Sequence, residues 1–67
     1  MNNIREIAES LGVELGEKFL TTNSCRCYWF EETGLFEGTG KFAKAPADMV
    51  LAELLSGARR ITKREYD

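Results

Sequence analysis

Hydrophobic residues near the start of the chain recur at helical spacing. One face of a helix would carry four of them: Ile4, Ile7, Ala8 and Leu11. Asn3 suits the N-cap position, because its side chain can accept a hydrogen bond from a free backbone N–H, and Gly12 can adopt the left-handed conformation that ends a helix. The pattern predicts an amphipathic helix over residues 3–11.

From Val13 the hydrophobic pattern takes the period of two that is typical of strands. The segment 17–22 carries aromatic and β-branched residues, and the segment 25–31 holds three consecutive aromatic residues. Glu32-Thr33-Gly34 offers a hairpin loop with glycine where a positive φ is needed, and it leads into a strand at 35–37. The sequence therefore predicts three strands, of which the second and third form a hairpin.

The second half of the chain predicts one more helix and one more strand. Pro46 suits a first helical turn, and before Gly57 there follows an apolar stripe of Ala47, Val50, Leu51, Leu54 and Leu55. We expect a helix over 46–56, a short edge strand around Ile61, a flexible loop at 38–45 and a frayed tail at 64–67. The order α-β-β-β-α-β predicts an α+β fold, a small antiparallel sheet with two helices packed on one face.

The second predicted strand is apolar on both of its faces. Alternation sends Tyr28 and Phe30 to one face, and Cys25, Cys27 and Trp29 to the other. A sheet that has helices on one side and water on the other alternates apolar with polar residues, so something covers the second face. Two alternatives remain open here: the loop at 38–45 brings Phe42 over this face, or the face centred on Trp29 binds a partner or a second copy.

Length and charge restrict the class of protein. The chain has 67 residues, enough for one domain, 1–67, and a net charge of −2, too mild to gather a polyanion. It has no His, which removes the commonest general base and zinc ligand, so we expect no enzyme and no cofactor. No apolar stretch is long enough to span a membrane, and no signal peptide is evident, so we expect a cytoplasmic protein.

Two short motifs have weak chemical interpretations. Cys25 and Cys27 would lie on the same face of a strand, where a disulfide between them would be strained, and they are too few to complete a zinc site in one chain. We favour free structural thiols over a metal site. Gly38-Thr39-Gly40-Lys41 lacks the spacing of a phosphate-binding loop, but Lys41 and Lys44 could contact an acidic partner surface.

The C-terminal region concentrates positive charge. Its basic residues are Arg59, Arg60, Lys63 and Arg64. This basic edge is a candidate nucleic-acid contact, but charged residues on an edge strand are ordinary protection against aggregation, and the chain as a whole is acidic. Nucleic acid is therefore the less favoured partner.

Three segments resemble a group of short proteins encoded by phages and prophages of Firmicutes. They are a Gly-Val-x-x-Gly-Glu-x-Phe stretch at 12–19, an aromatic strand with an acidic turn and Gly-Leu at 28–35, and a Leu-Leu-x-Gly helix end at 54–57 followed by Ile61-Thr62-Lys63. The chain departs from the group by its two cysteines, by the longer loop and by the absence of a basic tail with Pro and Trp. The resemblance implies that the protein acts in the bacterial cytoplasm. It supplies no catalytic residues that could be assigned to this chain.

These observations favour a small phage or prophage accessory protein that binds a host or phage protein. An inhibitor of a host defence system, of the anti-CRISPR kind, is one form of this hypothesis. Trp29 would be the anchor of the contact, with Phe42 beside it and with Lys41 and Lys44 as rim charges. The alternatives are a nucleic-acid-binding accessory protein that uses the basic edge, and a structural homodimer.

Overall fold

The computed structural model describes residues 3–38 and 44–64, and of Arg64 it describes the backbone alone. This part of the chain forms two helices and five strands in the order α1 (Ile4–Ser10), β1 (Phe19–Thr21), β2 (Tyr28–Glu31), β3 (Gly34–Gly38), β4 (Lys44–Pro46), α2 (Asp48–Ser56) and β5 (Ile61–Arg64). The strands form one antiparallel sheet in the order β4-β3-β2-β1-β5. The predicted α+β fold with a small antiparallel sheet is confirmed, with one strand more than expected.

Helix α1 begins and ends as its sequence predicts. The Asn3 side chain accepts a hydrogen bond from the backbone N–H of Arg5 at 2.8 Å, which satisfies one of the free donors of the first turn. The helix turns its small residue Ala8 into the core, where this side chain is fully buried. The apolar spacing therefore located this helix to within a residue at each end.

The additional strand, β4, occupies part of the predicted loop at 38–45. Gly38 ends β3, and Lys44–Pro46 pairs with β3 in a register that sets Phe36 opposite Pro46. Helix α2 consequently begins at Asp48 and not at residue 46. Proline lacks an N–H donor and is found at sheet edges, and β4 is an edge strand, so Pro46 fits a strand here as well as it fits a first helical turn. Residues 39–43, with the predicted contacts Lys41 and Phe42, lie outside the described residues.

The second strand is shorter than predicted, and both cysteines precede it. Strand β2 starts at Tyr28, so the expectation that Cys25 and Cys27 share a face of a strand is wrong. The Ser24 hydroxyl accepts a hydrogen bond from the backbone N–H of Arg26 at 3.1 Å, and such local bonds compete with a strand ladder.

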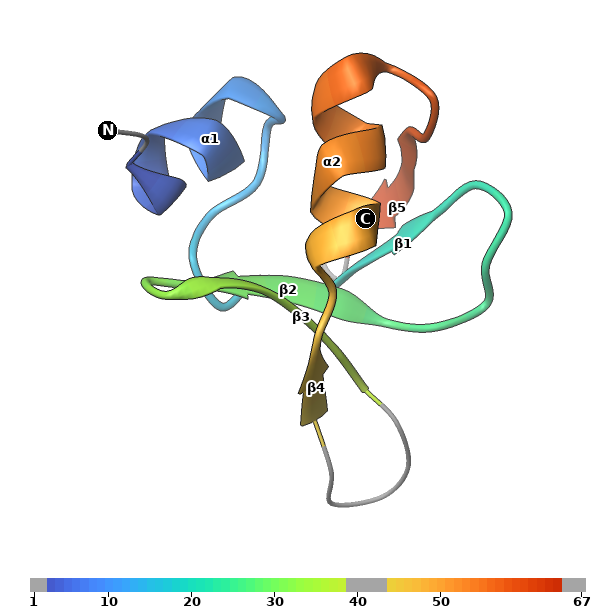
Figure 1. Cartoon of the computed structure of the whole chain (residues 1–67), viewed down its shortest axis with the longest axis horizontal. Helices are drawn as coiled ribbons and strands as arrows, with labels where there is room; N and C mark the ends of the chain where they lie inside the picture. Colours follow the sequence, from blue (N-terminus) through green and yellow to red (C-terminus); the bar gives the residue numbers. More distant parts are fainter. Residues whose placement is uncertain (1–2, 39–43, 65–67) are drawn as a thin grey trace.

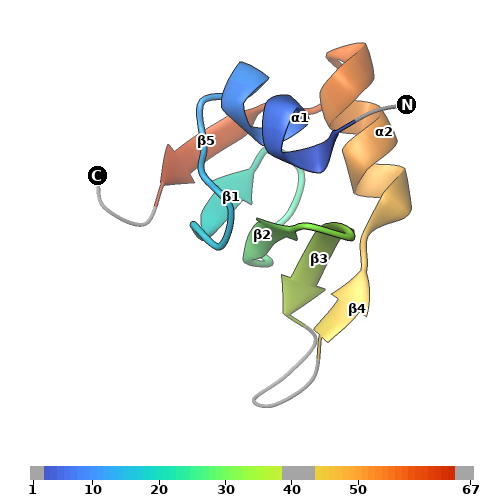
Figure 2. The ribbon, with the colours of Figure 1, turned by 90° about the vertical axis from the view of Figure 1, so that its left-hand side faces the viewer.

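Both helices lie on the same side of the β2–β3 hairpin (Figures 1 and 2). The core between the helices and the sheet consists of Ala8, Val13, Phe19, Tyr28, Phe30, Leu35, Ala47, Val50 and Leu54. Phe30 is fully buried, and its ring stacks on that of Phe19 with 5.9 Å between centroids. The predicted arrangement, two helices on one face of the sheet, leaves the other face without a covering layer among the described residues.

Helix α2 turns only part of its predicted apolar stripe toward this core. Val50 and Leu54 are buried, whereas Leu55, which was expected in the stripe, is 53% exposed. A helix has 3.6 residues per turn, so a residue next to one that faces the core is rotated well away from it. The helix ends at Gly57, whose φ of 85° is the left-handed conformation that the sequence predicts there.

Strand β5 lies beside β1 at the opposite edge of the sheet from β4. The predicted edge strand around Ile61 is confirmed, and it continues to Arg64, the first residue of the predicted frayed tail; residues 65–67 lie outside the described residues. In the described ranges, 3–38 and 44–64, no helix is long and apolar enough to cross a membrane.

Candidate functional site

Two aromatic side chains lie side by side on the sheet face that the helices leave uncovered. Trp29 of β2 is directly opposite Phe36 of β3, and Phe36 is directly opposite Pro46 of β4. Directly opposite residues of antiparallel strands share a face, so these three residues form a row across three strands. Trp29 and Phe36 are half-buried, in contrast to their neighbours Tyr28, Phe30 and Leu35 on the helix side, which are at most 2% exposed.

Charged side chains surround this aromatic row. Glu31 accepts a hydrogen bond from the indole N–H of Trp29 at 2.8 Å, and both of its carboxylate oxygens lie 2.8 Å from Lys44 Nζ. The same ammonium group is 4.6 Å from the centre of the Phe36 ring, which is within the range of a cation–π contact. Glu31 and Lys44 thereby bridge strands β2 and β4 over Phe36. We call Trp29, Phe36, Lys18, Glu31 and Lys44 the open-face site.

Lys18 and Gly38 place the indole of Trp29. The ammonium group of Lys18, in the segment before β1, lies 5.9 Å from the centre of the indole ring. On the other side, a Cβ atom at Gly38 would lie 3.9 Å from Cζ3 of Trp29, so the ring lies close against a residue without a side chain. A Cβ atom at this distance would be in ordinary van der Waals contact with the ring, so the indole lies against the end of β3 without requiring glycine there.

The carboxyl group of Glu31 is held in its charged form. Hydrogen bonds from Lys44 and then from Trp29, with the charge of Lys44 in addition, lower the pKa of Glu31 below its ordinary value, although partial burial acts in the opposite direction. At neutral pH the open-face site thus contains a carboxylate between two lysines, with one net positive charge.

The structure brings two of the four predicted contact residues together. Trp29 lies on the uncovered face as its alternation with Tyr28 and Phe30 predicts, and Lys44 lies beside it across the sheet. Lys41 and Phe42 lie outside the described residues. Sequence reasoning missed Phe36, Lys18 and Glu31. The predicted three-residue loop at 32–34 is wrong, because Gly34 already belongs to β3 and pairs with Glu31. The shorter turn at 32–33 sets Trp29 opposite Phe36, whereas a loop at 32–34 would set Trp29 opposite Glu37.

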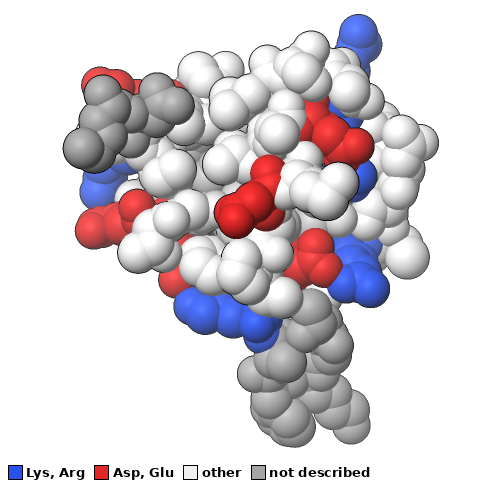
Figure 3. All heavy atoms as spheres, viewed as in Figure 1, with Lys and Arg blue, Asp and Glu red and all other residues white. Residues whose placement is uncertain are grey.

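One residue of the predicted basic edge is engaged within the structure. Arg59 points inward: its guanidinium contacts Glu53 at 2.7 Å and the Thr21 hydroxyl at 3.1 Å, and only 13% of its side chain is exposed. Arg60 and Lys63 are exposed, and the side chain of Arg64 lies outside the described part. On the molecular face shown in Figure 3, basic and acidic groups alternate among the described residues. On that face, the described residues therefore form no continuous basic surface of the kind that a polyanion requires.

The cysteines and carboxylates form no evident metal site. Cys25 is exposed and Cys27 is half-buried, and both are free thiols. Among residues 3–38 and 44–64, no group of three or more Cys, Asp or Glu side chains lies close enough together to hold a metal ion. The structure therefore offers no support for the metal alternative at Cys25 and Cys27.

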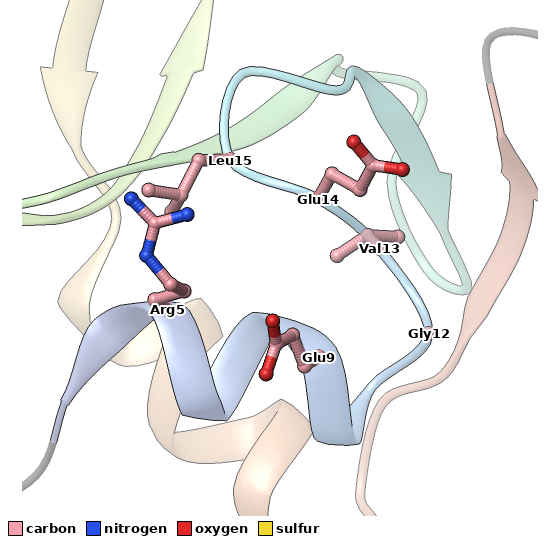
Figure 4. Close-up of a pocket in the computed structure, with 6 residues that line it drawn as sticks. All are labelled: Arg5, Glu9, Gly12, Val13, Glu14 and Leu15. Atoms are coloured by element: carbon pink, nitrogen blue, oxygen red, sulfur yellow. The ribbon is translucent and has the colours of Figure 1, made fainter.

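A shallow cleft lies between α1 and the loop that follows it. It has a volume of about 470 Å³ and is lined by Arg5, Glu9, Gly12, Val13, Glu14 and Leu15. Figure 4 shows Arg5 and Glu9 rising from α1 toward the loop that carries Glu14 and Leu15. The charged side chains along this cleft are exposed, and Arg5 forms a surface ion pair with Glu32 at 4.0 Å. Exposed charges of this kind hold a ligand weakly, so we assign none.

Comparison with known proteins adds no relative. No protein-family model, no curated protein and no solved structure matches this chain. The candidate site consequently rests on its own geometry. It is a pair of aromatic side chains on the uncovered face of the sheet, beside the Glu31–Lys44 ion pair.

Proposed function

We propose that this chain is a small, non-catalytic protein-binding module that docks on a partner protein through the open-face site. The observation that carries the proposal is the position of Trp29 and Phe36, two half-exposed aromatic rings side by side on the uncovered sheet face. Tryptophan is among the residue types most enriched at the energetic centre of protein interfaces, where flanking charged residues exclude water.

The polar groups of Trp29, Glu31 and Lys44 support this proposal because they are already paired with one another. The indole N–H of Trp29 donates to Glu31, and Glu31 holds Lys44. Burial of an unpaired donor or charge under a partner would cost free energy, whereas these groups keep their partners when water leaves. Their mutual bonds also hold the side chains in one geometry before binding, which lowers the entropy lost on association.

Charge indicates the kind of surface that fits. Lys18 and Lys44 lie at the margins of the aromatic pair, and Glu31 is the single carboxylate of the open-face site. A partner surface with an apolar group at its centre and an acidic group at its margin complements this distribution. Glu31 in the middle of the site disfavours a phosphate backbone, so the observations favour protein over nucleic acid.

The resemblance to phage-encoded proteins gives this proposal a biological setting. We place the module in a bacterial cytoplasm, with a host or phage protein as its partner, and an inhibitor of a host defence system is the form that we favour. The nucleic-acid-binding alternative has no comparable feature, because Arg59 of the basic edge is engaged by Glu53 and Thr21.

The test is capture of the partner and its reconstitution from purified proteins. Tagged wild-type protein and the variants Trp29→Ala, Phe36→Ala and Thr33→Ala are used as bait in a nuclease-treated lysate of a Firmicutes host. Thr33 is the control, because it is exposed in the turn of the same β2–β3 hairpin and lies outside the open-face site. Circular dichroism confirms that each variant is folded.

We expect wild type and Thr33→Ala to capture the same protein, and the two aromatic variants to lose it. With the purified partner, calorimetry should show an affinity lowered about thirtyfold or more by Trp29→Ala, the size of effect found at the centre of interfaces. Unchanged affinity in folded Trp29→Ala and Phe36→Ala would refute the open-face site. Capture of nucleic acid alone, when nuclease is omitted, would support the basic edge instead.

A further inference from the structure

The outward face of helix α2 carries an apolar stripe that nothing in the described structure covers. Met49 is 81% exposed and Leu55 is 53% exposed, and Ala52 is exposed between them. These residues are spaced by three, so they lie on one side of a helix that has 3.6 residues per turn. Val50 and Leu54 face the opposite way, into the core. The helix is therefore apolar on two sides.

The order of residues along this stripe is symmetric about Ala52. Met49 lies three residues before it and Leu55 three residues after it, and beyond them Asp48 and Ser56 are also equidistant from it. If two copies of α2 pack antiparallel with their Ala52 residues facing, each Met49 meets the Leu55 of the other copy. A two-fold interface requires this self-complementarity, in which residue i contacts residue j and j contacts i.

We propose that a second copy of this chain docks on the Met49–Ala52–Leu55 face of α2, in an antiparallel, two-fold arrangement. Ala52 lies on the two-fold axis, and its small side chain lets the two helices approach closely. Long, flexible Met49 and branched Leu55 then pack against each other on both sides of the axis.

Charge complementarity favours a second copy over an unrelated partner. The middle of the stripe carries no charge; exposed Asp48 lies at its N-terminal end, and exposed Arg60 follows three residues after Gly57 at the other end. In an antiparallel pair, the N-terminal end of each α2, with Asp48, lies beside the C-terminal end of the other. Arg60 follows that C-terminal end in the chain, so the two opposite charges come toward each other. The helix dipoles are then antiparallel as well, which is the favourable arrangement.

The size of the face indicates a weak dimer. Nine residues of α2 span about 14 Å at 1.5 Å per residue, so the contact falls well short of the roughly 800 Å² per partner that stable interfaces bury. We expect dissociation at micromolar concentrations and association toward the millimolar range. The open-face site lies on the other side of the sheet from α2, so each copy in the dimer keeps it free, and the dimer would bind a repeated partner at two points.

Sedimentation equilibrium from about 10 µM to about 1 mM tests the dimer. The mass of wild type should rise toward that of two chains, and Ala52→Glu, which places two like charges on the axis, should raise the dissociation constant at least about tenfold. Trp29→Ala, on the other face, should associate like wild type. A wild type that stays monomeric overturns the proposal, and so does an Ala52→Glu variant that associates normally.

Thiol crosslinking tests the register of the two helices. In a background of Cys25→Ser and Cys27→Ser, a mixture of the Met49→Cys and Leu55→Cys chains should form a mixed disulfide faster than either chain alone. Two residues at position 49 would be about 9 Å apart along the axis in the antiparallel pair, beyond disulfide reach without movement. Faster crosslinking of Met49→Cys with itself would indicate a parallel pair and refute the two-fold arrangement about Ala52.

Discussion

The carboxylate of Glu31 joins the aromatic pair to the charge of Lys44, and this makes the open-face site sensitive to acid. The folded-state pKa of Glu31 is lowered by the hydrogen bonds from Lys44 and Trp29. A group whose pKa is lower in the folded than in the unfolded state stabilises the fold above the ordinary glutamate pKa, near 4.3. That contribution is lost as the pH falls through the lower, folded-state pKa, because the protonated carboxyl no longer pairs with Lys44.

Trp29 is the only tryptophan of the chain, so its fluorescence should report this titration directly. We expect the emission of wild type to change with a midpoint below the ordinary pKa of a glutamate. In Glu31→Gln this transition should disappear, whereas Glu32→Gln, at the exposed neighbouring position, should keep it. An identical transition in Glu31→Gln would show that another group affects the indole.

Arg59 is the most engaged basic side chain in the described part of the chain, and it contributes to stability rather than to binding. It connects Glu53 of α2 with Thr21 of β1, and its guanidinium also reaches the hydroxyl of Tyr28 at 3.5 Å. Removal of this charged donor leaves Glu53 without its ion-pair partner, while Thr21 and Tyr28 each lose one hydrogen bond and keep another. Arg59→Ala should therefore lower the free energy of unfolding by about 1–3 kcal/mol. Arg60→Ala, at the exposed neighbour, should change it by less than about 0.5 kcal/mol. Urea unfolding followed by Trp29 fluorescence measures both, and equal effects would contradict this role.

At the scale of elements, the end of α2 depends on the backbone of Gly57. Its φ is 85°, and a Cβ atom added there would have no atom within 4 Å, so the cost of a side chain comes from the backbone conformation alone. Gly57→Ala should lower the free energy of unfolding by about 1 kcal/mol, the usual cost of the left-handed region for a non-glycine residue. Gly57→Asn should cost less, because asparagine tolerates this conformation. Thermal denaturation by circular dichroism compares the two; the reverse order would argue against a backbone origin.

Sequence predicts those elements whose signal lies within a single segment. The helix at 4–10 has both its apolar spacing and its N-cap in one run of residues, and the outward direction of Trp29 follows from alternation within one strand. Strand β4 has no such signal, since Lys44, Ala45 and Pro46 are not strand formers and are held by pairing with β3. Phe36 and Glu31 belong to the site because of the register between strands. Arg59 is not part of an exposed basic edge, because it contacts residues that are distant in sequence. Such pairings depend on the whole fold.

At the scale of the whole molecule, the sheet separates a face that maintains the fold from a face that is free to bind. Both faces carry aromatic residues of the same β2–β3 hairpin. Phe30 lies on the helix side and is fully buried, whereas Phe36 lies on the open side and is half-buried. A chain of 67 residues has a small core that typically supplies only about 3–5 kcal/mol, so the two faces should respond very differently to the same substitution.

Truncation of each phenylalanine to alanine is the sharpest test of this division. Phe30→Ala removes a ring that stacks on Phe19 in the core, at a cost of about 3–5 kcal/mol, which equals the stability that such a core provides. We therefore expect Phe30→Ala to be largely unfolded by circular dichroism. Phe36→Ala should keep a cooperative urea transition close to that of wild type while it loses the partner. Phe30→Leu, which keeps most of the buried volume, should restore folding, because the requirement at this position is core volume and not an aromatic ring. If Phe36→Ala unfolded as readily as Phe30→Ala, the open face would be part of the folding core and could not be reserved for a partner.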